Sequence, residues 1–238
     1  MTPSRSPKPV LPAPRQQRLR WLAVASALVV LLLLLLAVAQ RDRADAGAAA
    51  PQQELPAGPP WRHGAAQARF VLVLYADLAC PFCQSYVPQL HEWIGTQPDL
   101  LLQWHHLPLP MHEPVASQQA VLAECAGRTG GQAAFWSAIR WAYAQPHGSG
   151  QVPDLAAHLE ASEALRTCTD GSDAAASIRA QAQEALASGI AATPSLRLVD
   201  QHSGQSMFLA GPVQADALLS AIDMLASPEP DLEPHADR

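Results

Sequence analysis

The stretch Phe70–Cys83, FVLVLYADLACPFC, decides the fold because two sequence patterns meet in it. Its first half is a continuous apolar run, which is typical of a buried β-strand. Its second half holds two cysteines two residues apart, and Pro81 stands in what would be the first turn of a helix, where the missing proline N–H costs no hydrogen bond. Apolar residues then recur at helical spacing, at Phe82, Tyr86, Leu90 and Trp93. The stretch therefore predicts a strand that leads into a helix, with Cys80 at the junction.

The rest of the pattern predicts an α/β fold. Strands are expected at 68–75, 100–106, 195–199 and 206–209, and helices at 80–94, 114–126, 132–143, 153–166, 173–187 and 213–225. The order is strand, helix, strand, a block of helices, a β-hairpin and a closing helix. Without the helical block, a small mixed sheet with helices on both faces remains.

Residues 21–39 form a run without charge that, as a helix, would extend about 28 Å, close to the thickness of a bilayer core. Basic residues precede this run without any acid, whereas the two arginines that follow it are balanced by aspartates. This positive-inside pattern places residues 1–20 in the cytoplasm and sends the rest of the chain across the membrane. We predict a transmembrane anchor at 21–40. The alternative is a cleaved signal peptide, since Ala37-Val38-Ala39 fits signal peptidase.

Composition divides the remainder into three parts. Residues 41–61 are small, polar and proline-rich, as in a flexible linker, and residues 226–238 are acidic and proline-rich, as in a disordered tail. The folded domain is then 62–225, with a helical insertion at about 112–187. The net charge of −6 gives no indication of nucleic-acid binding.

The chain has four cysteines, all after the apolar run and hence, with this topology, in an oxidising compartment. Cys80 and Cys83 could form half a zinc site, a structural disulfide or a redox pair. Zinc needs further ligands, yet neither Cys125 nor Cys168 belongs to a second CxxC, and a disulfide closing so short a loop gives little stabilisation. The redox interpretation is favoured because a helix N-terminus at Cys80 stabilises a thiolate. We expect no metal and no cofactor.

Three segments in order resemble the DsbA-like thiol-disulfide oxidoreductases: FVLVLYADLACPFC, AVLAECAGRTGGQAAFWSAI and GIAATPSLRLV. The resemblance covers about residues 64–225. It implies a thioredoxin-like fold with an inserted helical subdomain, Cys80 as nucleophile and Cys83 as resolving cysteine. It also implies that Thr193-Pro194 forms a loop with a cis proline, which contacts substrate together with Pro81 and Phe82.

Two positions depart from the family pattern. Members commonly carry a buried acid six residues before the first cysteine, where this chain has Leu74. Asp77 is nearer to Cys80 but is expected only to cap the turn. The strongest oxidants of the family carry a histidine at the position of Phe82, so we expect a less oxidising pair that is still able to donate disulfides.

The other two cysteines are expected to form a structural disulfide, Cys125–Cys168, because an even number of cysteines in an oxidising compartment favours pairing. The alternative is two buried thiols. Three histidines, His105, His106 and His112, are expected to be surface or capping residues.

The sequence therefore predicts a membrane-anchored oxidoreductase that faces the periplasm and introduces disulfides into exported proteins. The resemblance implies a membrane redox partner, such as a quinone-linked oxidase, that reoxidises the pair. Two alternatives remain open: a reductase or isomerase kept reduced by a membrane electron donor, and a non-catalytic chaperone or binding module. Copper delivery is disfavoured by the two-residue spacing and by the lack of methionine-rich tracts.

Overall fold

The computed structural model describes residues 28, 30–32, 34, 54–145, 158–159 and 162–227. The chain divides into two compact units, residues 1–52 and 53–238, and the elements described below belong to the second. Its strands are β1 (Arg62–Gly64), β2 (Phe70–Ala76), β3 (Leu100–His106), β4 (Ser195–Asp200) and β5 (Ser206–Ala210). Its helices are α2 (Pro81–Ile94), the 3₁₀ turn η1 (Pro110–His112), α3 (Val115–Ala144), α5 (Glu163–Asp170), α6 (Asp173–Ala187) and α7 (Ala215–Ala226).

The five strands form one mixed sheet in the order β1-β3-β2-β4-β5. Strands β2 and β3 are parallel and are connected through α2, whereas the other neighbouring pairs are antiparallel. Leu74 in the central strand pairs with Trp104 on one side and Leu196 on the other. The predicted strand-helix-strand unit and hairpin thus share one sheet, as expected for this α/β class. The edge strand β1 was not predicted, because its three residues are too few to show a pattern.

Helix α2 packs on the sheet through a stripe slightly different from the predicted one. Its buried residues are Cys83, Tyr86, Val87, Leu90 and Ile94. The prediction that Phe82 belongs to this stripe is wrong, since its side chain is 66% exposed. Phe82 lies about 100° around the helix from Cys83, so the face that buries the thiol turns the phenyl ring outward.

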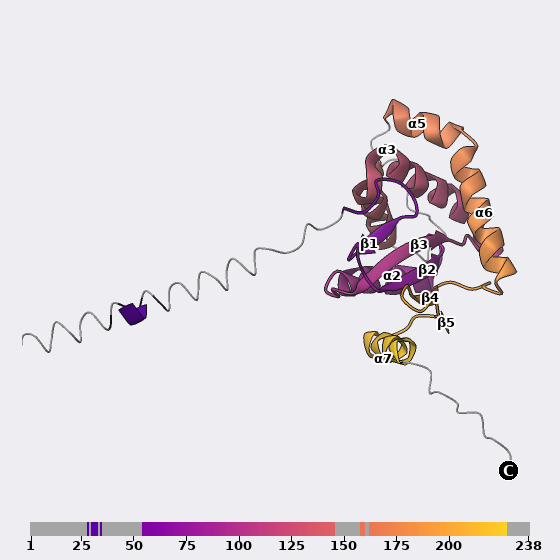
Figure 1. Cartoon of the computed structure of the whole chain (residues 1–238). Coiled ribbons are helices and arrows are strands. Elements are labelled where there is room, and N and C mark those ends of the chain that lie inside the picture. The colour runs from indigo at the N-terminus through magenta and orange to yellow at the C-terminus, as the bar shows by residue number, and fades with distance from the viewer. Residues whose placement is uncertain are drawn as a thin grey trace, which may run out of the picture. The chain divides into compact units, whose positions relative to one another are not determined.

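The helical insertion lies between β3 and β4. Figure 1 shows α3, α5 and α6 at the end of the domain away from α7. Helix α3 breaks at Gly131, whose φ of 75° is non-helical. The first predicted helix was expected to stop at residue 126, but α3 continues through Gly127. A Cβ atom at that position would lie 2.5 Å from an atom of the Trp61 ring, so the glycine permits close packing rather than ending the helix.

The structure describes only part of the predicted helix at 153–166: α5 begins at residue 163 and continues to residue 170, beyond the predicted end. Of residues 153–161, only 158 and 159 are among those described. The predicted tail at 226–238 lies outside the described residues except for its first two positions.

The predicted boundary between linker and domain at residue 62 is wrong. Trp61 is only 1% exposed and stacks on Phe135 at 4.9 Å between ring centroids. The Gln132 side chain also donates hydrogen bonds to the carbonyl oxygens of Pro56 and Gly58, at 2.8 and 3.0 Å. Residues 56–61 therefore belong to the domain, although their composition resembles a linker.

Most of the predicted anchor at 21–40 lies outside the described residues. Within the part of the chain that the structure describes, no helix is long and apolar enough to cross a membrane.

Candidate active site

The two cysteines of the CxxC motif lie where β2 gives way to α2. Cys80 is the N-cap residue of α2, with extended backbone angles, and Pro81 follows at the first helical position. The Cys80 N–H group donates a hydrogen bond of 3.2 Å to the carbonyl oxygen of Asp77, which closes the turn. Both thiols are free and buried. This is the strand-to-helix junction that the sequence predicted.

The surroundings of Cys80 favour its thiolate. A hydrogen bond from the Cys83 thiol is the largest influence, and it outweighs burial to lower the pKa of Cys80 to about 5. The Thr193 side chain and the first N–H groups of α2, at Phe82 and Cys83, lower the pKa of Cys80 further. Cys80 is therefore ionised at neutral pH when the pair is reduced.

The surroundings of Cys83 have the opposite effect. Its side chain is 0% exposed, and burial raises the pKa of its thiol well above the usual range; the hydrogen bond to Cys80 acts in the same direction. Neighbouring thiols that differ in this way divide the work of disulfide exchange. Cys80 can attack or leave as a thiolate, while Cys83 stays protonated and shielded until it is needed.

The loop before β4 completes the site. The Thr193–Pro194 peptide bond is cis, and Cys80 Sγ lies 3.4 Å from the Thr193 carbonyl oxygen, which accepts a hydrogen bond from the thiol when Cys80 is protonated. Thr193 and Pro194 are buried against the motif, whereas Pro81 and Phe82 are exposed beside it. The structure thus gathers Cys80, Cys83 and the Thr193-Pro194 loop at one place.

Asp77 has a larger part in this site than capping the turn. Its carboxylate accepts hydrogen bonds from the Ala79 N–H at 2.7 Å and from the Leu109 N–H at 2.8 Å, and it pairs with His112 Nδ1 at 2.7 Å. The side chain is 0% exposed. Asp77 therefore fastens the CxxC turn to the loop after β3, and His112 is a partner of this carboxylate rather than a simple surface residue. An acid directly after a buried strand was the only signal in the sequence.

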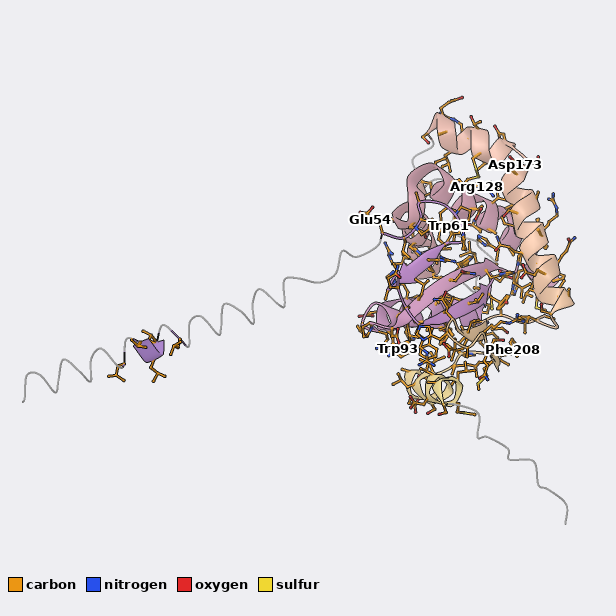
Figure 2. The ribbon with its side chains drawn as sticks, in the orientation of Figure 1. Glu54, Trp61, Trp93, Arg128, Asp173 and Phe208 are labelled. Atoms are coloured by element: carbon orange, nitrogen blue, oxygen red, sulfur yellow. A yellow bond between two sulfur atoms is a disulfide. The ribbon has the colours of Figure 1, made fainter. Side chains whose placement is uncertain are left out.

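Leu74 is fully buried, so the position where the family commonly has an acid is apolar here. A buried acid of the insertion is Glu124 of α3, which accepts hydrogen bonds from Trp61 Nε1 at 2.5 Å and Arg128 Nε at 2.9 Å. Figure 2 shows these two partners close together. His106 Nε2 lies 3.6 Å from the same carboxylate. Burial alone would raise the pKa of Glu124, but these partners, led by His106, lower it to about 2.

The expectation that His105 and His106 are surface residues is wrong. His105 is 7% and His106 is 1% exposed. His105 Nε2 lies 2.7 Å from the Gln181 carbonyl oxygen, and His106 Nδ1 accepts a hydrogen bond of 3.0 Å from Trp104 Nε1. Both histidines end a strand that the insertion covers, and this tertiary covering is not visible in the local sequence.

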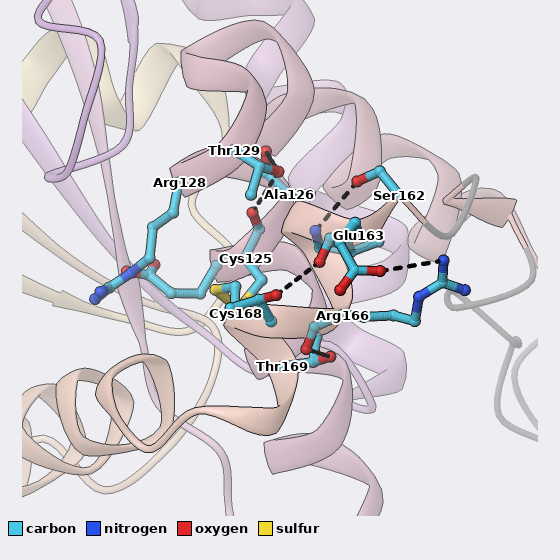
Figure 3. The surroundings of a disulfide bond; sticks show 12 residues. Cys125, Ala126, Arg128, Thr129, Ser162, Glu163, Arg166, Cys168 and Thr169 are labelled. Atoms are coloured by element: carbon cyan, nitrogen blue, oxygen red, sulfur yellow. Dashed lines mark hydrogen bonds and ion pairs between the residues drawn. A yellow bond between two sulfur atoms is a disulfide. The ribbon is translucent and has the colours of Figure 1, made fainter.

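Cys125 and Cys168 form a disulfide that joins α3 to α5 across a sequence separation of 43 (Figure 3). Cys125 is 0% exposed and packs with Leu165 and Ala174. The Thr129 hydroxyl donates a hydrogen bond of 2.8 Å to the Cys125 carbonyl oxygen. The disulfide therefore cross-links two helices of the insertion, α3 and α5, at a buried position.

Metal-ligating side chains do not come together in the described ranges. Among these residues, no group of three or more His, Cys, Asp or Glu could hold a metal ion.

Comparison with known proteins identifies the family. The family model described as thioredoxin matches residues 57–224. The structure of DsbA2 from Pseudomonas aeruginosa is 39% identical in sequence, with 76% of this chain and 100% of that chain covered and a TM-score of 0.64. The α-DsbA1 structure from Wolbachia pipientis shares the fold at 19% identity, with 72% and 92% coverage and a TM-score of 0.58.

A curated relative, the Na⁺/H⁺ antiporter NhaA 3 of Salinispora tropica, is 36% identical over 73 residues, which are 31% of this chain and 11% of that protein. The chain thus spans only a small part of that relative's length. The match over the folded domain, the buried CxxC pair and the cis-proline loop agree with one another: the chain belongs to the thioredoxin family, among the DsbA-like thiol-disulfide oxidoreductases.

Proposed function

We propose that the chain oxidises dithiols in exported proteins through the Cys80–Cys83 pair. The observation that carries this proposal is the opposite displacement of the two pKa values, with Cys80 at about 5 and Cys83 well above its usual range. A stabilised Cys80 thiolate favours the reduced form of the pair. The corresponding disulfide is then easily reduced, which makes it an oxidant of other thiols.

The reaction begins with the disulfide form of the pair. A substrate thiolate attacks Cys80 Sγ, and the bond between Cys80 and Cys83 breaks. The second substrate thiolate then attacks the substrate sulfur of this mixed disulfide, so that the substrate leaves with a disulfide and Cys80 leaves as a stabilised thiolate. We assign contacts with the substrate chain to Thr193 and Pro194 beside Cys80, and to the exposed Pro81 and Phe82.

Oxidation of the next substrate requires that the reduced pair lose two electrons. We propose a membrane redox partner as the acceptor and an anchor at residues 21–40 that holds the domain on the extracytoplasmic side. The charge distribution around this segment supports that topology, and the Cys125–Cys168 disulfide is of the kind that persists in an oxidising compartment. Fractionation of cells expressing the full chain tests the anchor: the protein should remain in membranes after a carbonate wash, and deletion of residues 1–40 should release it.

A reductase or isomerase is the second candidate, and one observation favours it. Phe82 occupies the position between the cysteines that is histidine in the strongest oxidants of the family, and its ring cannot donate a hydrogen bond to the thiolate. The reduction potential of the pair, measured by equilibration with glutathione, separates the two directions. A value near that of thioredoxin, about −270 mV, would contradict the oxidase assignment.

Oxidation of a two-cysteine peptide tests the activity itself. The wild-type disulfide form should oxidise the peptide stoichiometrically, and Cys80→Ser should abolish this reaction. Equal activity in both proteins would remove the enzymatic role and leave a binding module of the same fold.

A further inference from the structure

Tyr143 connects the helical insertion to the CxxC turn. It lies near the C-terminal end of α3 and is 3% exposed. Its hydroxyl donates a hydrogen bond of 2.9 Å to the Asp77 carbonyl oxygen, the same atom that accepts the Cys80 N–H. The hydroxyl is also hydrogen-bonded to the Cys83 thiol. A single phenol oxygen therefore touches both the turn and the buried sulfur.

Disulfide exchange places a negative charge on that buried sulfur. When a substrate thiolate bonds to Cys80 Sγ, the Cys80–Cys83 bond breaks and its electron pair leaves on Cys83 Sγ. A thiolate without water around it is costly unless hydrogen-bond donors face it. The Asp77 backbone and the Thr193 side chain supply two such contacts. The apolar Leu74 supplies none, whereas the Tyr143 hydroxyl, from the insertion, lies against the same sulfur.

We propose that Tyr143 is a catalytic residue whose hydroxyl donates a hydrogen bond to the Cys83 sulfur while that sulfur carries the charge. In the reduced pair, in which Cys83 is protonated, the hydroxyl donates to the Asp77 carbonyl oxygen. Rotation about its C–O bond directs the same proton to the thiolate, and a proton from solvent then neutralises Cys83. The reverse step, in which the Cys83 thiolate attacks Cys80 Sγ and expels the substrate thiolate, uses the same contact.

Among the described residues, few charged or titratable groups lie near the Tyr143 hydroxyl. Cys80 and Cys83 face it from α2 and Asp77 faces it from the preceding turn, while His112 reaches this cluster through the Asp77 carboxylate. Burial raises the pKa of Tyr143 well above its usual range, and the neighbouring Cys83 and Asp77 act in the same direction. The phenol therefore keeps its proton at neutral pH and serves as a donor rather than as a base.

The inference rests on the proposed thiol-disulfide exchange, but it holds for either direction of electron flow. Its test is Tyr143→Phe, with Tyr86→Phe as a matched control. The Tyr86 hydroxyl also donates a 2.9 Å hydrogen bond to a backbone carbonyl oxygen, that of Val213. The two variants lose the same kind of bond, but only one of them loses a contact with Cys83.

The first measurement is the rate at which glutathione opens the disulfide of the full chain, followed by maleimide gel shift. Loss of one hydrogen bond to a charged group predicts that Tyr143→Phe is slower by about tenfold. The control variant should stay within about twofold of the wild type.

The second measurement is the pH profile of the return step, in which Cys83 expels glutathione from Cys80. Tyr143→Phe should shift the rising limb upward by about one pH unit, which a purely structural role would not do. Incorporation of 3-fluorotyrosine at position 143 keeps the ring and strengthens the donor, so it should shift the limb downward even if the phenylalanine variant folds poorly.

Unchanged rates and profiles in the Tyr143 variants, with an active wild type, would overturn the inference. An inactive wild type would instead refute the proposed function.

Discussion

Replacing Glu124 by glutamine tests the ionic contacts of this buried carboxylate with His106 and Arg128. Glutamine keeps the size of the side chain and removes its titration. Glu124 has a pKa of about 2 in the folded protein against an ordinary value of 4.5 for a glutamate side chain. Since the folded-state value is the lower one, the carboxylate contributes stability above about pH 4.5, and this contribution is lost as the pH falls toward 2. Linkage between these two values predicts a loss of about 2 kcal/mol between pH 6 and pH 3.

Urea unfolding at several pH values measures this effect. The difference in unfolding free energy between the wild type and Glu124→Gln should be constant above about pH 6 and should shrink by about 2 kcal/mol by pH 3. Glu92→Gln, a change of the same chemistry at an exposed position of α2, serves as the control. A difference between wild type and Glu124→Gln that does not depend on pH would refute the assignment of a low pKa to this carboxylate, whatever its size at neutral pH.

Three further predictions concern the disulfide, the helix glycine and the reactive thiol. Replacing Cys125 and Cys168 together by alanine should lower the unfolding free energy by up to about 4 kcal/mol in urea, since the chain-entropy model assigns this value to a loop of about 44 residues, while peptide oxidation by the folded protein persists. Gly127→Ala should destabilise the domain by about 1–3 kcal/mol in thermal unfolding, because the added Cβ would lie 2.5 Å from an indole carbon; stabilisation, as helix propensity alone predicts, would contradict the close packing. The alkylation rate of Cys80 should rise with a midpoint near pH 5, and Cys83→Ala should raise that midpoint because the hydrogen bond from Cys83 is its largest cause; an unshifted midpoint would assign the effect to the helix terminus.

The local pattern predicted most of the fold, since long apolar runs and helical periodicity fixed the strands and helices around the CxxC motif. The errors have a common physical cause. Trp61 was assigned to a linker because its neighbours are prolines and glycines, yet it fills the core. Gly127 was interpreted as a helix end because glycine itself is a poor helix former. In both places a contact between distant segments overrides local propensity, and Trp61 and Gly127 are in fact partners.

Some residues of the candidate site could likewise be predicted from the sequence, and others could not. Cys80, Cys83, Thr193 and Pro194 could be named from motif and resemblance, because their spacing along the chain carries the information. Tyr143 could not, because it lies on the insertion and meets the motif only through tertiary packing.

The order of the four cysteines along the chain has a consequence for how the protein matures. Each cysteine belongs with its neighbour in sequence, Cys80 with Cys83 and Cys125 with Cys168, so the two pairs do not interleave. With the proposed topology, in which the residues directly after the anchor cross the membrane first, the cysteines emerge in the order in which they belong together. Joining each one to the next to appear gives the native pairing, so biogenesis of the protein requires an oxidant but no subsequent reshuffling of mispaired bonds.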